Sequence, residues 1–154
     1  MHGQDHLELS ASDSDAIRNE FNWGVDLFNF GFYWEAHEAW EGVWNAFGRT
    51  GSRAGFVKGL IKLAAAGVKA LEGNARGVER HRNRAIELLN EAHESKTIDW
   101  RLEFGVSPAR LVGLVPQSEI MARTETQSNQ GCVMPFVIID ESKCTHDGRE
   151  PHAQ

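Results

Sequence analysis

Residues 54–74 read AGFVKGLIKLAAAGVKALEGN, and most positions in this stretch are apolar or small. At the helical repeat of about 3.6 residues per turn, apolar side chains cover most of the circumference, so we expect a central helix buried on nearly all sides. The small residues share one stripe, where a neighbouring backbone can approach closely: Gly55, Gly59, Ala66 and Ala70. The polar strip is narrow and consists of Lys58, Lys62 and Lys69.

Turn signals on both sides of this helix predict its neighbours. Gly31 and Gly48 bound a periodic segment before it, and Gly73 with Asn74 separates it from another periodic segment after it. The spacing predicts helices over about 14–30 and 32–47, a third from a cap at Ser52 to residue 71 or 72, and a fourth to about residue 93. Because short connections join antiparallel neighbours, we predict an all-α fold, a compact bundle of two antiparallel helical hairpins.

The pattern weakens after residue 96. Ser107 and Pro108 make a helix cap and a first-turn proline, so we expect a short extra helix over about 108–114, before Pro116. The segment PFVIID suggests a short strand or an extended arm, and the polar sequence beyond it suggests a loose tail. We therefore divide the chain into a flexible N-terminus (1–13), a helical domain (14–115) and an extended C-terminal arm with a tail (116–154).

Length and charge limit the classes of function. A chain of 154 residues suits one domain. The net charge of -6 argues against general binding to nucleic acid or to an anionic membrane surface. Three lysines interrupt the longest apolar region, and no secretory signal precedes the first helix, so we expect no membrane segment and a cytoplasmic location.

Residues 33–44 read YWEAHEAWEGVW and hold the candidate site. On a helical wheel His37 lies among aromatic side chains, with Glu41 beside it one turn later. We expect both to face inward, and a buried carboxylate needs a proton, a hydrogen bond, a cation or a metal. The aromatic side chains expected to wall this pocket are Tyr33, Trp40 and Trp44.

Two interpretations of His37 and Glu41 remain open. In one, a buried hydrogen bond between them fixes how the second helix packs, or the lysine strip neutralises the carboxylate. In the other they form half of a site for a divalent metal ion or a small polar ligand, with His81 of the fourth helix as the best further ligand. A metal with an open position would make hydrolysis by activated water conceivable. The H-E-x-x-H pattern of zinc proteases is absent, because Glu41 occupies the place of the second histidine.

The segments FNFGFYWEAHEAWEGVW and GLIKLAAAGVKALEGNARG give the chain a family resemblance. Over about residues 21–89 it resembles the bacterial and archaeal domain-of-unknown-function family 309. That family has a His-x3-Glu-x2-Trp/Tyr motif, matched here by His37, Glu41 and Trp44. The resemblance implies a small all-helical protein and a metal-binding role for the motif. Relatives often carry a histidine where this chain has Lys69.

The two hairpins also share a pattern at an offset of 42 residues. Gly31 corresponds to Gly73, Ala36 to Val78, and Trp44 to Ile86. Such repetition is typical of tetratricopeptide-like helix pairs, which bind partners on a stacked surface. Two units are fewer than the usual three, so a protein partner or self-association into a homo-oligomer would complete the array. In this alternative the histidine and glutamate are purely structural.

Overall fold

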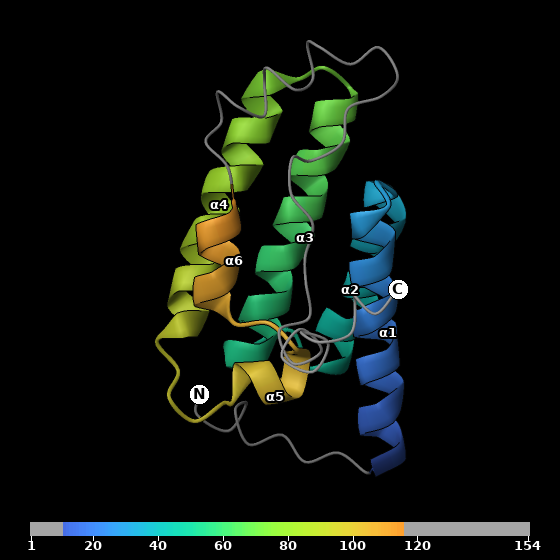
Figure 1. Ribbon diagram of the computed structural model, residues 1–154, viewed down its shortest axis with the longest axis vertical. Helices are drawn as coiled ribbons and strands as arrows, with labels where there is room; N and C mark the ends of the chain where they lie inside the picture. Colours follow the sequence, from blue (N-terminus) through green and yellow to red (C-terminus); the bar gives the residue numbers. More distant parts are fainter. Residues whose placement is uncertain (1–10, 116–154) are drawn as a thin grey trace, which may run out of the picture.

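The computed structural model describes residues 11–115, and these form helices without any strand (Figure 1). The helices are α1 (Ala11–Asn29), α2 (Tyr33–Ala46), α3 (Gly51–Leu71), α4 (Ala75–His93), α5 (Trp100–Phe104) and α6 (Pro108–Leu114). Helices that follow one another in sequence pack side by side, from α1 on α2 to α3 on α4, and α6 lies against α4. The predicted all-α class and its adjacent helix pairs are confirmed.

Glycines in the left-handed region form the two hairpin turns. Gly31 has φ 87° and Gly73 has φ 73°, and such angles are unfavourable for residues with a Cβ atom. After the second turn, the Asn74 side chain accepts a hydrogen bond of 2.8 Å from the Gly77 backbone N–H and caps α4. Gly31 and Gly73, one pair of the 42-residue correspondence, therefore occupy equivalent turns, each before the second helix of its pair.

Helix α3 is central, as predicted, and packs on α2 and α4. Its glycines allow this close packing, because an added Cβ at Gly59 would lie 2.9 Å from Leu89 of α4. At Gly67 the same atom would lie 2.5 Å from the Tyr33 ring of α2. Gly55 belongs to the stripe of small residues described above, but a Cβ added there would meet no atom within 4 Å. Only part of that stripe is therefore in close contact with a neighbouring helix.

The predicted helix ends are close to the observed ones, with two local differences. Thr50 rather than Ser52 is the N-cap residue of α3, so this helix begins at Gly51, two residues earlier than predicted. The sequence interpretation missed α5, whose five residues are too few for a periodic pattern. Asp99 caps it by accepting a hydrogen bond of 3.2 Å from the Leu102 N–H. The predicted cap at Ser107 is confirmed, since its hydroxyl accepts from the Arg110 N–H at 3.2 Å.

Two further expectations concern other parts of the chain. The flexible N-terminus and the C-terminal arm and tail lie outside the described residues, apart from positions 11–13, which belong to the first turn of α1. Within residues 11–115, no helix has the length and hydropathy of a membrane span.

Candidate functional site

Helix α2 buries the side that carries Ala36, Ala39, Trp40 and Val43. Trp40 is 0 % exposed and donates its indole N–H to the Phe21 carbonyl of α1 at 3.1 Å. Tyr33 is also buried and meets the Phe28 ring edge-on, with the ring centroids 5.1 Å apart. Both side chains therefore belong to the core between α1, α2 and α3.

The expectation that Glu41 faces inward is wrong, because its side chain is exposed. Trp34, which lies seven residues before Glu41 and so on the same side of α2, is exposed as well. The small residues Ala36 and Ala39 mark the true centre, since they let α2 approach its neighbours.

His37 lies at the edge of the buried side and is half-buried. Its ring stacks on Trp34, with the centroids 5.2 Å apart and an angle of 9° between the planes. Its Nδ1 atom is inaccessible to solvent and has no hydrogen-bond partner among residues 11–115. A buried imidazole nitrogen without a partner is an unsatisfied polar group.

The metal site suggested by the sequence is not found in the described part of the chain. Residues 11–115 contain no group of three or more His, Cys, Asp and Glu side chains that could hold a metal ion. His37, Glu41 and His81 therefore do not make the proposed three-ligand set. The physical reason is the outward direction of Glu41, which separates the carboxylate from the half-buried histidines.

Helices α2, α3 and α4 bring cationic groups together instead. Burial lowers the pKa of Lys62 on α3 below its ordinary value, and the charges of Lys58 and Arg84 lower it further. The pKa of His81 on α4 is lowered by burial first and then by Lys62, Arg80, Lys69 and His37. We call the group of His37, Lys58, Lys62 and His81 the basic junction. Its members come from three helices, and the charged neighbours that shift Lys62 and His81 are all cationic.

Trp44 forms one wall of the basic junction. It is half-buried, and the Lys58 ammonium lies 4.4 Å from the centre of its ring. The Arg49 guanidinium lies 5.5 Å from the same ring. Cations at these distances are attracted by the negative face of an indole. Trp44 thus holds Lys58 beside Lys62, whereas the sequence interpretation had placed Trp44 around a carboxylate.

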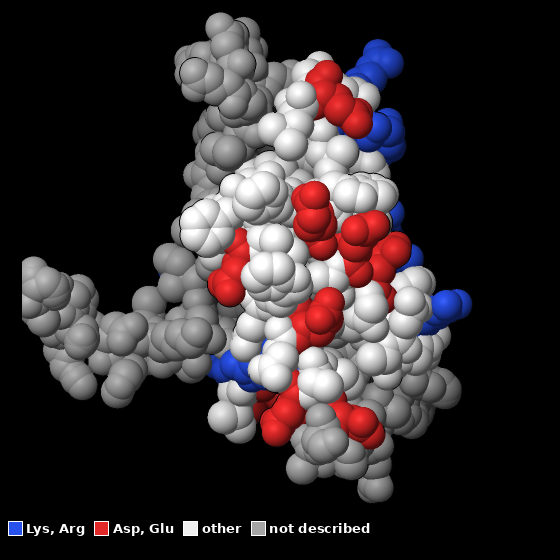
Figure 2. All heavy atoms as spheres, turned by 90° about the vertical axis from the view of Figure 1, so that its right-hand side faces the viewer, with Lys and Arg blue, Asp and Glu red and all other residues white. Residues whose placement is uncertain are grey.

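The outer side of α1 and α2 has the opposite charge. Figure 2 shows acidic side chains gathered among uncharged ones on this side of the molecule, with basic side chains at its edges. Large aromatic side chains of α1, α2 and the turn between them are exposed: Trp23 54 %, Phe30 77 %, Phe32 54 % and Trp34 53 %. We call these four residues, with exposed Glu20, Asp26, Glu35, Glu38 and Glu41, the acidic aromatic face. The sequence interpretation missed it, although no lysine or arginine occurs between Arg18 and Arg49.

Comparison with known proteins supports the family resemblance. Residues 21–81 match the family described as "Domain of unknown function (DUF309)". Neither the curated proteins nor the solved structures gave a match. The matched segment runs from α1 into α4 and includes His37, Glu41 and Trp44 in the predicted motif, whereas α5 and α6 lie beyond it. Together with the adjacent helix pairs described above, this match identifies residues 21–81 as a DUF309 domain.

Proposed function

We propose that the protein binds a small anionic ligand, through a carboxylate or phosphate group, at the basic junction. The observation that carries this proposal is the half-buried Lys62, which forms no hydrogen bond or ion pair with any residue of 11–115. An ammonium group that loses water without gaining an anionic partner raises the energy of the folded state. A bound anion would offset that cost.

The neighbours of Lys62 support the same ligand chemistry. Lys58 is held over Trp44 and adds a second positive charge. The pKa of His81 is lowered because burial and the neighbouring positive charges disfavour its protonated form. A bound anion would favour the protonated form instead. His37, whose positive charge also lowers the pKa of His81, adds a further cationic group beside the ligand. Because these groups lie on three different helices, together they would fix the orientation of a bound anion.

Sulfate is a suitable probe, because it stays a dianion throughout the pH range in which histidine titrates. At constant ionic strength, sulfate at about ten times its Kd should stabilise the protein by about 1.4 kcal/mol, or about 3 to 5 °C in Tm. The variant Lys62→Met should lose most of this shift, and its Tm without sulfate should be equal or higher, because the unpaired cation is gone. Differential scanning calorimetry measures both quantities.

Lys96→Met is the matched control, because Lys96 is exposed beyond the end of α4 and away from the basic junction. It should keep the full sulfate shift. The wild-type shift should also grow as the pH falls from 8 to 6, since a bound anion raises the lowered pKa of His81 and binding then takes up a proton. His81→Gln should flatten this pH dependence. Equal sulfate shifts in Lys62→Met and Lys96→Met would reject the proposal.

The exposed aromatic side chains favour a second candidate function, an interaction module. Contiguous exposed apolar surface marks protein contact sites, and Trp is prominent among residues that dominate binding energy. Trp23 shares a side of α1 with Asp26, and Phe30 follows the end of this helix, where its backbone N–H still donates to the Asp26 carbonyl. Trp34 shares a side of α2 with Glu41. The carboxylates select a partner with positive charge. We therefore infer that the acidic aromatic face binds a cationic amphipathic helix of another protein.

A synthetic helical peptide with lysine on one side and leucine on the other tests this second function. Its binding, followed by tryptophan fluorescence, should weaken about tenfold in the double variant Trp23→Ser/Phe30→Ser, because both changes remove apolar contact area. Leu71→Ser, a change at an exposed leucine at the end of α3, should leave the affinity unaltered. Two results would contradict a cationic amphipathic partner. One is equally tight binding of a peptide made of lysine alone. The other is self-association of the protein, detected by sedimentation, that the double variant abolishes.

A further inference from the structure

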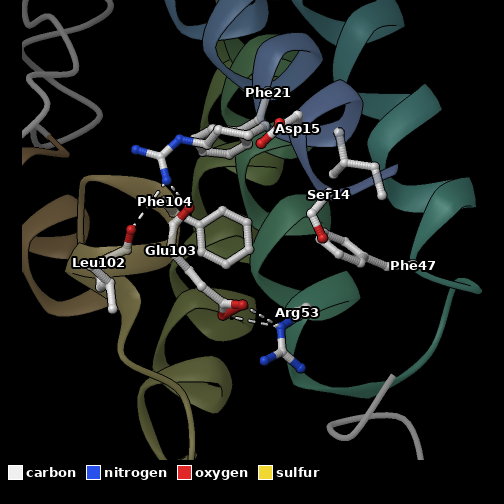
Figure 3. Close-up of a pocket in the computed structure, with 10 residues that line it drawn as sticks. Ser14, Asp15, Phe21, Phe47, Arg53, Leu102, Glu103 and Phe104 are labelled. Carbon is white, nitrogen blue, oxygen red and sulfur yellow. Dashed lines mark hydrogen bonds and ion pairs between the residues drawn. The ribbon is translucent and has the colours of Figure 1, made fainter. Parts of the chain in front are cut away.

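A cleft of about 580 Å³ lies between α1 and α5 (Figure 3). Phe47, directly after α2, and Arg53, in the first turn of α3, complete its lining. It is separate from the basic junction and from the acidic aromatic face, since it shares no residue with either. Its volume lies in the range of small-molecule sites. Three of its lining residues, Leu102, Glu103 and Phe104, come from α5, which lies beyond the DUF309 match.

Aromatic rings form the apolar part of the cleft. Phe21, Phe47 and Phe104 are buried and pack on one another, with the Phe104 centroid 5.1 Å from Phe21 and 6.0 Å from Phe47. Ile17 of α1 and the exposed Leu102 of α5 extend this surface to the rim. Rings fixed by packing offer a preformed surface, so a ligand with an apolar ring or chain can bind without rearrangement of the core.

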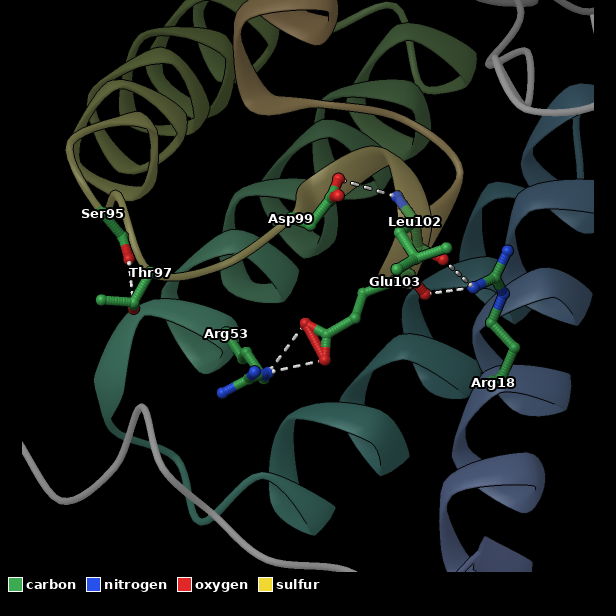
Figure 4. A network of polar contacts seen from close by, with 7 residues as sticks. All are labelled: Arg18, Arg53, Ser95, Thr97, Asp99, Leu102 and Glu103. Carbon is green, nitrogen blue, oxygen red and sulfur yellow. Dashed lines mark hydrogen bonds and ion pairs between the residues drawn. The ribbon is translucent and has the colours of Figure 1, made fainter. Parts of the chain in front are cut away.

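The two arginines at the cleft are already engaged (Figure 4). Arg18 directs its guanidinium at α5 and donates to the carbonyl oxygens of Leu102, at 3.1 Å, and Glu103. The Arg53 Nε–H is shared between both carboxylate oxygens of Glu103, each at 3.1 Å. These bonds hold α5 against α1 and α3, and the Glu103 carboxylate balances the positive charge of Arg53.

The uncommitted polar groups of the cleft are on α1. Within residues 11–115, neither the Asp15 carboxylate nor the Ser14 hydroxyl forms a hydrogen bond or ion pair. Figure 3 shows both side chains on the α1 wall, across from Glu103 and Arg53. A carboxylate and a hydroxyl next to aromatic rings suit an ammonium group, since both oxygens accept its hydrogens and the faces of the rings attract its charge.

We propose that this cleft binds a small organic cation, an amine whose apolar ring or chain packs on Phe21, Phe47 and Phe104 while its ammonium group meets Asp15 and Ser14. The amine supplies the positive charge and hydrogen-bond donors that Asp15 lacks, and its apolar body displaces water from the rings. An anion of the same shape is repelled by Asp15, and the Arg53 guanidinium already donates to the Glu103 carboxylate.

Two probes with the same ring and opposite charge test the proposal: 2-phenylethylamine and phenylacetate at pH 7. Titration of the full chain, followed by chemical-shift changes in its backbone amide NMR spectrum, should give a Kd of about 1 mM for the amine, with shifts at the cleft residues. Phenylacetate should bind at least about tenfold more weakly. Asp15→Asn should weaken amine binding about fivefold by removing the charge while keeping the side-chain shape.

Glu91→Gln is the control, since it removes one exposed carboxylate charge on α4, away from the cleft and from the acidic aromatic face. It should leave the amine affinity unaltered, and the unshifted amide signals report that both variants are folded. Three results would overturn the proposal: no shifts at cleft residues with the amine, phenylacetate binding as tightly as the amine, or equal amine affinity in Asp15→Asn and wild type.

Discussion

Replacing Gly24 with alanine should lower the free energy of unfolding by about 2 kcal/mol. The added Cβ would lie 2.3 Å from Nε1 of Trp40, and this indole cannot move aside because it is fully buried and bonded to the Phe21 carbonyl. Alanine gains about 1 kcal/mol over glycine from helix propensity. Overpacking and the loss of the indole hydrogen bond outweigh that gain. Urea unfolding followed by circular dichroism measures the difference.

Gly42→Ala is the control for this prediction. Gly42 lies inside α2 and is exposed, and an added Cβ there meets nothing within 4 Å. The same substitution should therefore stabilise the protein by about 0.5 to 1 kcal/mol. If Gly24→Ala were as stable as Gly42→Ala, Trp40 would not be fixed against α1 as described.

Replacing Gly67 with alanine should lower the free energy of unfolding by about 1 to 2 kcal/mol and also impair the basic junction. The new Cβ would lie 2.5 Å from Cγ of the buried Tyr33 ring, so α2 must move away from α3. His37 follows Tyr33 by about one helical turn and would move with it, away from Lys62 and His81. The sulfate-dependent shift in Tm should therefore decrease together with the stability.

Gly55→Ala is the control that separates the contact between Gly67 and Tyr33 from the effect of alanine on the stability of α3 as a helix. Gly55 lies in the same helix, and an added Cβ there meets nothing within 4 Å. We expect it to gain about 0.5 to 1 kcal/mol and to keep its sulfate shift. A Gly67→Ala protein with unchanged stability and unchanged sulfate binding would contradict both the packing of Tyr33 on Gly67 and the dependence of the basic junction on it.

Much of the fold was predictable because its signals are local. The ends of the long helices follow from Gly31, Gly48 and Gly73, whose positive φ angles end one helix and let the chain turn before the next. Ser107 and Pro108 likewise predict α6, because a cap and a first-turn proline act within a few residues. Helix α5 was missed, since five residues carry no measurable period and its position depends on Arg18 and Arg53 from distant helices.

The candidate site was only partly predictable. The sequence drew attention to His37, Trp44, the lysine strip and His81, and the structure brings three of these together at the basic junction: His37, Lys62 and His81. It could not give the direction of Glu41, because a helical wheel fixes the angles between side chains and leaves open which side meets the neighbouring helix. Exposed aromatic residues such as Trp34 then bias the estimate toward the wrong side.

The sequence by itself determined the number of long helices, the approximate positions of their ends, and the packing of consecutive helices as pairs. Turn residues, periodicity and short connections act over a few residues, so these features are encoded locally. Only the tertiary structure decided which sector of α2 is buried, which cations from different helices meet around Lys62, and that α5 closes a cleft against α1. These features depend on contacts between residues far apart in the chain, where Trp40 inserts against Gly24 and Tyr33 against Gly67, and no local pattern encodes those distances.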